Sequence, residues 1–447
     1  MKTLHLKKGF NHPLSVKTTP GFEETVKPEK IGLVPSVFRG IKPKLLVEKN
    51  ESVKTGTPVF FDKNNPDLIF TSPGSGKITD IQTGKKRIIK KIEILLDENE
   101  DYEELFSVTE SNLRTISQND LIHALLKNGL WPFIRSLPFR VIADFNKLPD
   151  KIYIKLSDNA PFYPRPEAWL KQRLKGFYHG LSVMKKLCSD VIVYADQDNH
   201  YIRSECQNSI NYLISGKYPS FDPGVIAYRT NKKTSDIWYL DGQSIVTIGE
   251  TLLYGRFSTK KIFVVGGQEI KFPYHVSSRY GAPVTSLLKT NQNFINKQRF
   301  ISGDIYTGFQ TEKDGYTGFY ESGLSVVPEG DEKELFAFLK LGIDKPSFSN
   351  TFVSKIFNKG IKTDCNTHGE KRACINCGYC ERVCPVDILP QFTMKALHAD
   401  EIDLALSHGL LDCTECSLCS YVCPSKISLK EIFTEAKAKY LKEEEAE

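Results

Sequence analysis

The sequence lacks several features that would assign it to a specialised class of protein. No apolar run approaches the roughly 18 residues of a membrane-spanning helix, and the first residues, MKTLHLKKGFNHPLSV, lack the continuous apolar core of a signal peptide. The basic excess is small, 60 Lys and Arg against 54 Asp and Glu, which does not favour nucleic acid as a partner. We therefore expect a multidomain chain that stays in the cytoplasm.

A glycine-rich nucleotide loop is also missing. The segments KIYIKLSD, AWLKQRLKGFYHGLSVMKKL and DVIVYADQD predict a strand, one helix and a strand, and hence a parallel, Rossmann-like α/β domain over residues 111–255. A dinucleotide site in such a domain needs G-x-G-x-x-G between strand and helix, and none occurs there. The sequence therefore identifies no NAD or flavin site.

The first segment, residues 1–110, predicts a small all-β unit, because apolar pairs alternate with Gly, Pro, Asn and Asp turn signals. It resembles the barrel-sandwich of lipoyl and biotinyl carrier domains. Lys63, in an Asp-Lys pair, is similar to their attachment lysine, but the spacing to the following Ser-Pro is longer than in the carriers, so a structural hairpin is the favoured interpretation. In the basic run GKKRIIKKIEI we expect Ile88, Ile92 and Ile94 in the strand core.

Two further segments complete an α+β multidomain fold. Residues 256–330 are β-rich, and the stretches VVGG and GAPVTSLL resemble a β-grasp (SLBB-like) module, in which His275 and Arg279 are expected as packing or surface residues rather than ligands. Residues 331–447 predict an α-helical, ferredoxin-like domain with helices over DEKELFAFLKLGI, MKALHADEIDLALSHGLL and the final SLKEIFTEAKAKYLKEEEAE.

Cysteine is scarce until residue 374 and then dense. Only three of the 11 cysteines come earlier, and Cys188 and Cys206 are expected to be buried as small apolar residues. For Cys365, near His368, a loop thiol without function is favoured over an extra ligand. The other eight form two cassettes, CINCGYCERVCP at 374–385 and CTECSLCSYVCP at 413–424. In a cytoplasmic protein such a pattern indicates metal ligands rather than disulfides.

The spacing of the cassettes predicts two [4Fe-4S] clusters. C-x2-C-x2-C brings three sulfurs to one face of a cubane, and the cysteine of the following C-P pair ligates the other cluster, whereas structural zinc uses two separated cysteine or histidine pairs. The first cluster would take Cys374, Cys377, Cys380 and Cys423; the second would take Cys413, Cys416, Cys419 and Cys384. Gly378 and Ser417 occupy equivalent positions in the two cassettes and are expected to let backbone N–H groups approach sulfur.

Over nearly its full length the chain resembles the A subunits of the Na+-translocating NADH:quinone oxidoreductases. The matching stretches include KKGFNHPLSV, FFDKNNPDLIFTSPGSGKITDIQTGKKR, GLWPFIRSLPF, RFISGDIYTG and GYCERVCPVDILP. The resemblance implies a peripheral subunit on the cytoplasmic side of the bacterial inner membrane, docked on the membrane-embedded B subunit, with a quinone near that contact. It also implies kinship to the C subunit of the Rnf complex, which carries two clusters.

This sequence departs from both relatives. It has GLWPFIRSLPF where the Rnf subunit has its glycine-rich loop, yet it keeps eight cysteines that well-known A subunits have mostly lost. Three interpretations remain open: an electron-relaying subunit of the sodium-translocating complex, an Rnf-type ferredoxin:NAD oxidoreductase subunit, and a structural docking subunit whose clusters only hold the last domain together.

Overall fold

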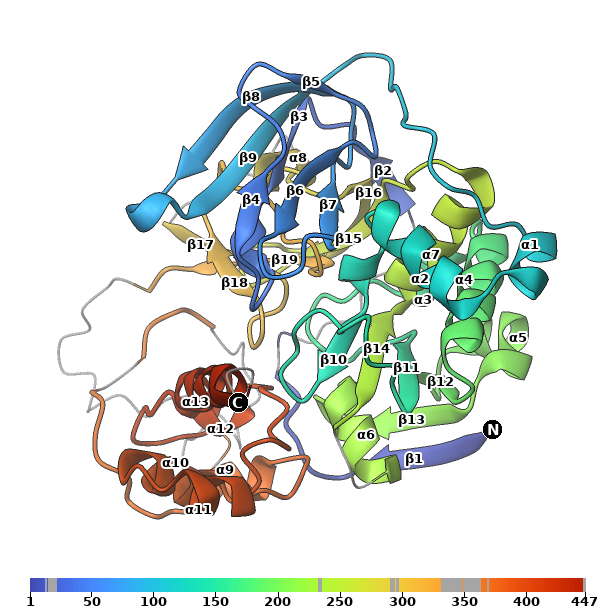
Figure 1. The fold of residues 1–447 in the computed structure, drawn as a ribbon. Helices are drawn as coiled ribbons and strands as arrows, with labels where there is room; N and C mark the ends of the chain where they lie inside the picture. The colour runs from blue at the N-terminus through green and yellow to red at the C-terminus, as the bar shows by residue number, and fades with distance from the viewer. Residues whose placement is uncertain are drawn as a thin grey trace.

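The structure is a computed structural model, which describes residues 1–12, 14, 22–231, 235–289, 294, 297–330, 348, 363–367 and 370–444. Within these ranges the chain forms an N-terminal β unit of two small sheets, two six-stranded sheets and a C-terminal group of helices (Figure 1). The six-stranded sheets are called the second and third sheets below, because they follow the N-terminal β unit. The predicted helix DEKELFAFLKLGI lies outside the described residues. No helix in the described part of the chain is both long and apolar enough to span a membrane.

Two small antiparallel sheets form the N-terminal β unit, drawn in blue in Figure 1. One has the order β3-β9-β8-β5 and the other β4-β6-β7. The strands are β3 (Lys30–Leu33), β4 (Pro43–Leu45), β5 (Ser52–Val53), β6 (Pro58–Asp62), β7 (Ile69–Thr71), β8 (Gly76–Thr83) and β9 (Ile89–Leu96), with short 3-10 turns η1 (Pro35–Val37) and η2 (Lys85–Arg87).

The prediction for the basic run was partly wrong. Ile92 and Ile94 are fully buried, as expected, but Ile88 is 58% exposed and Ile89 is buried in its place. The turn η2 and a register shift after Gln82 begin β9 one residue later than the alternation assumed. Because side chains of a strand alternate between faces, this offset turns Ile88 to solvent.

The second sheet carries the α/β arrangement that the sequence predicted. Its order is β1-β13-β12-β11-β14-β10, and all neighbouring pairs are parallel except β14 with β10. Its strands are β1 (Lys2–Leu6), β10 (Arg135–Leu137), β11 (Lys151–Lys155), β12 (Val191–Asp196), β13 (Tyr212–Gly216) and β14 (Ile237–Asp241). The helices around it are α1 (Glu110–Thr115), α2 (Gln118–Lys127), α3 (Pro166–Leu170), α4 (Leu174–Leu187), α5 (His200–Glu205), α6 (Pro223–Asn231) and α7 (Gly242–Tyr254), with 3-10 turns η3 (Trp131–Phe133) and η4 (Gln207–Ser209).

The segment AWLKQRLKGFYHGLSVMKKL forms two helices, α3 and α4, rather than one. The break falls at Arg173, whose guanidinium is drawn inward by Glu250 on α7, at 2.6 Å between Nη2 and Oε2. Beyond the break, α4 and α7 pack in backbone contact, since a Cβ on Gly249 would lie 1.9 Å from the carbonyl oxygen of Gly176. We infer that the ion pair of the buried Arg173 with Glu250 stabilises the fold more than a continuous helix would.

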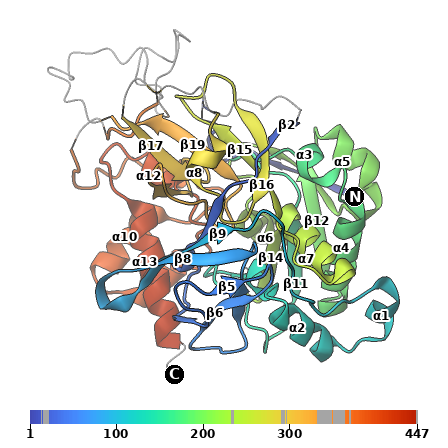
Figure 2. The same ribbon diagram turned by 90° about the horizontal axis from the view of Figure 1, so that it is seen from above.

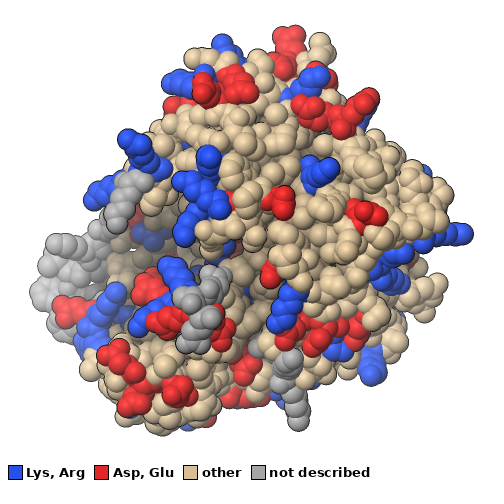
Figure 3. Space-filling view, viewed as in Figure 1, with Lys and Arg blue, Asp and Glu red and all other residues tan. Residues whose placement is uncertain are grey.

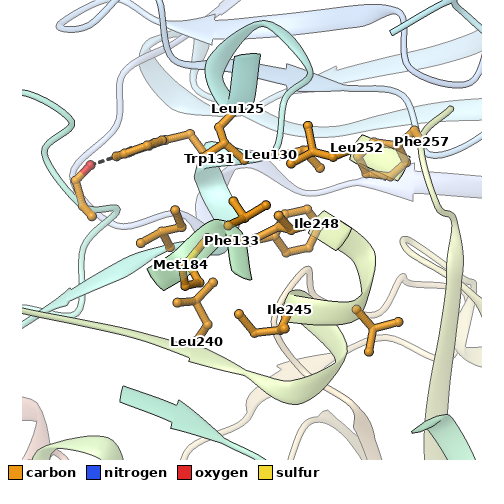
Figure 4. Close-up of a cluster of buried hydrophobic side chains, with 14 of the residues drawn as sticks. Leu125, Leu130, Trp131, Phe133, Met184, Leu240, Ile245, Ile248, Leu252 and Phe257 are labelled. Atoms are coloured by element: carbon orange, nitrogen blue, oxygen red, sulfur yellow. Dashed lines mark hydrogen bonds between the residues drawn. The ribbon is translucent and has the colours of Figure 1, made fainter. Parts of the chain in front are cut away.

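Helix α2 leads into the main core. Ser117 caps its first turn by accepting the N–H of Asp120, and Gly129, at φ 66°, ends it. The next residues form η3, and Trp131 and Phe133 are buried among side chains from α2, α4 and α7 (Figure 4). The indole N–H of Trp131 donates to the carbonyl of Ala143 at 2.7 Å. GLWPFIRSLPF is therefore a packing segment in this structure.

The third sheet is mixed, with the order β18-β17-β19-β15-β16-β2. Its elements are β2 (Phe22–Thr25), β15 (Lys260–Gly266), β16 (Tyr274–Arg279), β17 (Gln298–Ser302), β18 (Phe309–Thr311), β19 (Gly323–Pro328) and helix α8 (Val284–Leu287). Strands β1 and β2 show that residues 2–6 and 22–25 contribute to the second and third sheets rather than to the N-terminal β unit.

The C-terminal helices are α9 (Tyr379–Val383), α10 (Pro390–His398), α11 (Ile402–Ser407), α12 (Leu418–Tyr421) and α13 (Leu429–Glu444). The segment MKALHADEIDLALSHGLL is split between α10 and α11, because Asp400 adopts a left-handed conformation at φ 56°. Seen from above, α10 and α13 lie on one side of the molecule and α4 and α5 on the opposite side (Figure 2). On the face shown in Figure 3, basic and acidic side chains are interspersed.

Candidate metal centres

The two cassettes adopt the same backbone path. Asn376 and Gly378 in the first, and Glu415 and Ser417 in the second, have left-handed φ values between 53° and 72°. Gly378 and Ser417 precede α9 and α12, and no atom lies within 4 Å of the Cβ position of Gly378. Such turns point successive N–H groups to one side, where they can meet an anionic group.

The first cavity brings together cysteines from both cassettes. Three cysteines of the first cassette and one from the second line it, namely Cys374, Cys377, Cys380 and Cys423. The cavity measures about 380 Å³ to its open mouth. Its rim is accessible, since Ile375 is 67% exposed. Inside, the Cys380 thiol donates to Oε1 of Gln391 at 3.1 Å.

The second cavity shows the reciprocal arrangement. It is lined by Cys384 from the first cassette and by Cys413, Cys416 and Cys419 from the second, and measures about 360 Å³ to its mouth. The N–H of Glu415 donates to Sγ of Cys413 at 3.5 Å, and N–H groups of Val386 and Ile388 reach Sγ of Cys384. The structure thus groups all eight cysteines into two sets of four, each drawn from both cassettes.

Burial makes isolated thiolates unfavourable in both cavities. It raises the pKa of Cys380 to about 11 and that of Cys384 to about 12, and neighbouring cysteines of the same set add to the effect. Burial also raises the pKa of Cys419. Cys374 and Cys380 of the first set and Cys413 and Cys419 of the second pack in one hydrophobic cluster, so the two cavities are neighbours. Ligand thiols must lose their protons, so a positively charged group is needed to hold them as thiolates.

The donor set of each cavity fits an iron-sulfur cluster. Within the described ranges, no three His, Cys, Asp or Glu side chains are grouped so as to hold a single metal ion. Each cavity instead offers a set of four cysteines, with backbone N–H groups directed at sulfur. Thiolates with N–H donors around them are the usual environment of a [4Fe-4S] cluster.

A buried charge network supports the second cavity. Glu415 is 4% exposed and meets Arg39 at 2.6 Å and Lys437 at 3.2 Å. Burial acts to raise the pKa of Glu415, but Lys437, Arg39 and nearby Arg140 hold it at about 2. Lys437 also donates to the carbonyls of Cys413 and Pro138, at 3.0 and 2.6 Å. The second cassette is thereby tied to α13, to the N-terminal β unit and to the α/β domain.

Further contacts tie both cassettes to the rest of the chain. Asp387, which follows Cys384, pairs with Arg229 of α6 at 2.7 Å and with Lys8 at 2.8 Å. The hydroxyl of Tyr218 donates to the carbonyl of Cys416 at 3.2 Å. Sequence reasoning missed these residues. The sequence offered one indication of them: the second cassette has a charged residue, Glu415, at the position where the first cassette has the neutral Asn376.

The remaining candidates lie away from the cavities. Cys188 and Cys206 are buried, as predicted, and Cys365, whose pKa burial raises, packs beside Val327 and lines neither cavity. Lys63 is exposed, and the neighbouring Asp62 is buried and accepts the N–H groups of Lys42 and Asn64. The Asp-Lys pair thus has a structural explanation in its hairpin.

His275 and Arg279 both have packing roles. His275 is fully buried and accepts the N–H of Arg165 at 3.2 Å. Arg279 forms an ion pair with Glu100 at 2.8 Å, which joins the third sheet to the N-terminal β unit.

Family models match three parts of the chain. The NqrA N-terminal barrel-sandwich hybrid domain matches residues 4–97, the NqrA second alpha/beta domain matches 116–257, and the 4Fe-4S dicluster domain matches 373–427. These matches confirm the predicted barrel-sandwich, α/β and iron-sulfur parts of the fold, while the β-grasp module and the domain boundaries stay predictions.

Curated relatives match along almost the whole chain. The A subunit of the Na(+)-translocating NADH-quinone reductase of Actinobacillus pleuropneumoniae serotype 5b is 29% identical, over 94% of this chain and 95% of its own. Those of Yersinia pseudotuberculosis serotype O:1b and Neisseria meningitidis serogroup B are also 29% identical, over 97% and 95% of this chain and 99% and 96% of theirs.

Among solved structures, the NAD+-reducing [NiFe]-hydrogenase in its H2-reduced state covers 52% of each chain at 9% identity, with a TM-score of 0.32, from which nothing about fold or function follows. The NqrA domain models and the full-length relatives agree on one assignment. The chain belongs to the NqrA family, the A subunits of Na+-translocating NADH-quinone reductase.

Proposed function

We propose that this subunit relays electrons through two [4Fe-4S] clusters within a Na+-translocating NADH:quinone oxidoreductase. The observation that carries the proposal is the reciprocal grouping of the cysteines. Cys374, Cys377, Cys380 and Cys423 would hold the first cluster, and Cys413, Cys416, Cys419 and Cys384 the second. Neither cassette supplies four cysteines to one cavity, so each cluster needs both cassettes folded together.

When bound, such clusters supply one-electron transfer. The chain's own residues would set where electrons enter and leave. The exposed Ile375 lies on the rim of the first cavity, whereas Leu418, Phe433 and Glu415 in the lining of the second are buried. Backbone N–H groups directed at sulfur, together with low exposure, tune the potential of each cluster. This asymmetry supports electron exchange with a partner on the side of the first cavity.

The proposed location is the cytoplasmic face of the bacterial inner membrane. Its support is the name of the relatives, which are A subunits of a multi-subunit reductase. The membrane-embedded B subunit would be the main partner, and a quinone would bind near that contact. NADH would be oxidised elsewhere in the complex, because no glycine-rich loop follows a strand of the α/β domain.

A structural docking role is the second candidate, and the contacts of the second cassette favour it. Arg39, Tyr218 and Arg229, from distant parts of the chain, all bind residues in or beside the cassettes. Clusters that only stabilise this arrangement would leave electron transfer to other subunits, since metal binding couples to folding.

Cysteine variants in the intact complex distinguish the electron relay from the structural docking role. Cys377→Ala and Cys416→Ala should each remove about four irons per chain, and relay predicts loss of NADH:quinone turnover with assembly intact. Cys188→Ala, which alters a cysteine outside both cavities, is the matched control and should keep iron and turnover. Unchanged turnover in the assembled Cys377→Ala and Cys416→Ala complexes would leave only the docking role.

A further inference from the structure

A basic β-hairpin projects from the N-terminal β unit and takes no part in the cysteine cavities. It joins β8 to β9 through the turn η2 and lies at the left edge of the molecule in Figure 1 and in Figure 2. The N–H of Gly84 donates to the carbonyl of Ile88 at 2.7 Å, and Arg87 adopts a left-handed conformation at φ 58°. The backbone itself closes the turn, and residues 84–91 are called the hairpin tip.

The hairpin tip carries cations without counterions. Between Ile81 and Ile92 the chain has no acidic residue. The basic residues of this stretch are Lys85, Lys86, Arg87, Lys90 and Lys91. Lys91 approaches Glu93 at 3.7 Å, whereas the exposed Lys85, Arg87 and Lys90 form no ion pair with a described residue. Figure 3 shows basic side chains gathered at the upper left, where Figure 1 draws the hairpin. A positive field therefore surrounds the turn.

An apolar side chain stands among these cations. Ile88 is 58% exposed, whereas the neighbouring Ile89 is buried in the core. Lys90 reaches back across the turn, since a Cβ on Gly84 would lie 2.7 Å from its Cε. A single exposed isoleucine is ordinary by itself. Cations for lipid phosphates and an apolar side chain for the acyl boundary are, however, the two contributions that bind a protein reversibly to a membrane surface.

Two arguments favour lipid headgroups over a protein as the occupant. An ordinary protein interface takes about 20–30 residues a side, which is more than the hairpin tip offers. The cytoplasmic loops of membrane proteins carry an excess of Lys and Arg that would repel this turn, whereas the cytoplasmic leaflet carries anionic lipids that would attract it. The second argument rests on the cytoplasmic location proposed above.

We propose that the hairpin tip binds anionic phospholipid headgroups, with Lys85, Arg87 and Lys90 at the phosphates and Ile88 at the acyl boundary. The contact is reversible, because a few cations and one apolar side chain make a weak anchor. It orients the subunit relative to the membrane, in addition to any contact with partner subunits.

The test is co-sedimentation of the full-length protein, purified without oxygen, with vesicles of equal parts phosphatidylglycerol and phosphatidylcholine. We expect saturable binding that falls as salt is raised, and no binding to vesicles of phosphatidylcholine alone. Lys85→Gln, Lys90→Gln should bind about tenfold or more weakly, since each cation near an anionic surface contributes about fivefold. The matched control is Lys175→Gln, Lys185→Gln, which removes the same charge from exposed positions on α4, on the opposite side in Figure 2, and should bind as the wild type does.

The variant Ile88→Trp tests whether the tip itself enters the membrane surface. The three native tryptophans, Trp131, Trp169 and Trp238, are buried, so the introduced indole is the exposed one. Its emission should shift to shorter wavelength on the anionic vesicles and be quenched by brominated acyl chains. A tip attracted by charge but held off the surface would keep its solvent-exposed emission, which would contradict the proposal.

Equal binding to both kinds of vesicle would also overturn the proposal, as would unchanged binding of Lys85→Gln, Lys90→Gln. If these two changes released other subunits of the complex and left vesicle binding as it was, the tip would be a protein contact instead. A chain that co-purifies with the membrane subunits but binds no vesicle would refute this inference alone. A chain that does not co-purify with them would refute the proposed location, whatever the vesicles show.

Discussion

Replacing Lys437 by Met should loosen the second cassette far more than its position on a terminal helix suggests. Lys437 is 2% exposed and binds Glu415, the Cys413 carbonyl and the Pro138 carbonyl through its single ammonium group. Its removal leaves a buried carboxylate with one fewer cation, and breaking a buried pair in this way costs about 3–5 kcal/mol. At about 1.4 kcal/mol per tenfold, local opening would rise about 100-fold to 4,000-fold.

Hydrogen exchange of peptides covering residues 413–422 measures this opening directly. Lys439→Met is the matched control, because Lys439 is on the same helix but its side chain is 76% exposed and, among the described residues, its one ion pair is with Glu443. Its effect should stay below about 0.5 kcal/mol. The double variant Glu415→Gln, Lys437→Met should recover much of the protection, since the stranded charge is gone. Equal exchange in the two lysine variants would refute this reasoning.

Three further predictions follow from other contacts. Burial acts to raise the pKa of Glu100, but hydrogen bonds from Arg279 and Thr55 outweigh it and hold that pKa below its ordinary value of 4.5. The stabilisation from the Glu100–Arg279 pair is therefore full at neutral pH and is lost as the pH falls below 4.5. Thermal unfolding of Glu100→Gln should depend less on pH in this acidic range than that of the wild type, and an unchanged pH dependence would contradict the assignment. Burial raises the pKa of Cys206 to about 11, so iodoacetamide at pH 8 should leave it unmodified in the native protein, as mass spectrometry can check. Trp131→Phe removes the donor to the Ala143 carbonyl and should cost about 1–3 kcal/mol, seen as a lower midpoint of thermal unfolding; no shift would show that the bond contributes little.

The cysteine sets could be predicted from the sequence because their chemistry lies in local spacing. Three cysteines with two residues between each pair converge on one face whatever surrounds them, and a repeat of the run specifies the exchange of the fourth. Helix α2 was predictable for the same reason, since Ser117 and Gly129 act within one turn of the helix ends.

Features that depend on distant residues could not be predicted. The break at Arg173 needs Glu250 on α7, and the exposure of Ile88 follows from a register shift against β8. The network of Glu415 joins Arg39 to Lys437, which are almost 400 residues apart in the sequence. Likewise, the sequence alone does not show that Arg135 lies over the rings of Tyr239 and Tyr320.

The central claim is tested most directly by counting metal in the full-length protein purified without oxygen. Iron and acid-labile sulfide are measured together, and EPR spectra are recorded during stepwise reduction. The account predicts about eight irons and eight sulfides per chain and two reducible, magnetically interacting centres, because the two cysteine cavities are neighbours. Zinc in place of iron, or a single cluster with four cysteines left free, would contradict it.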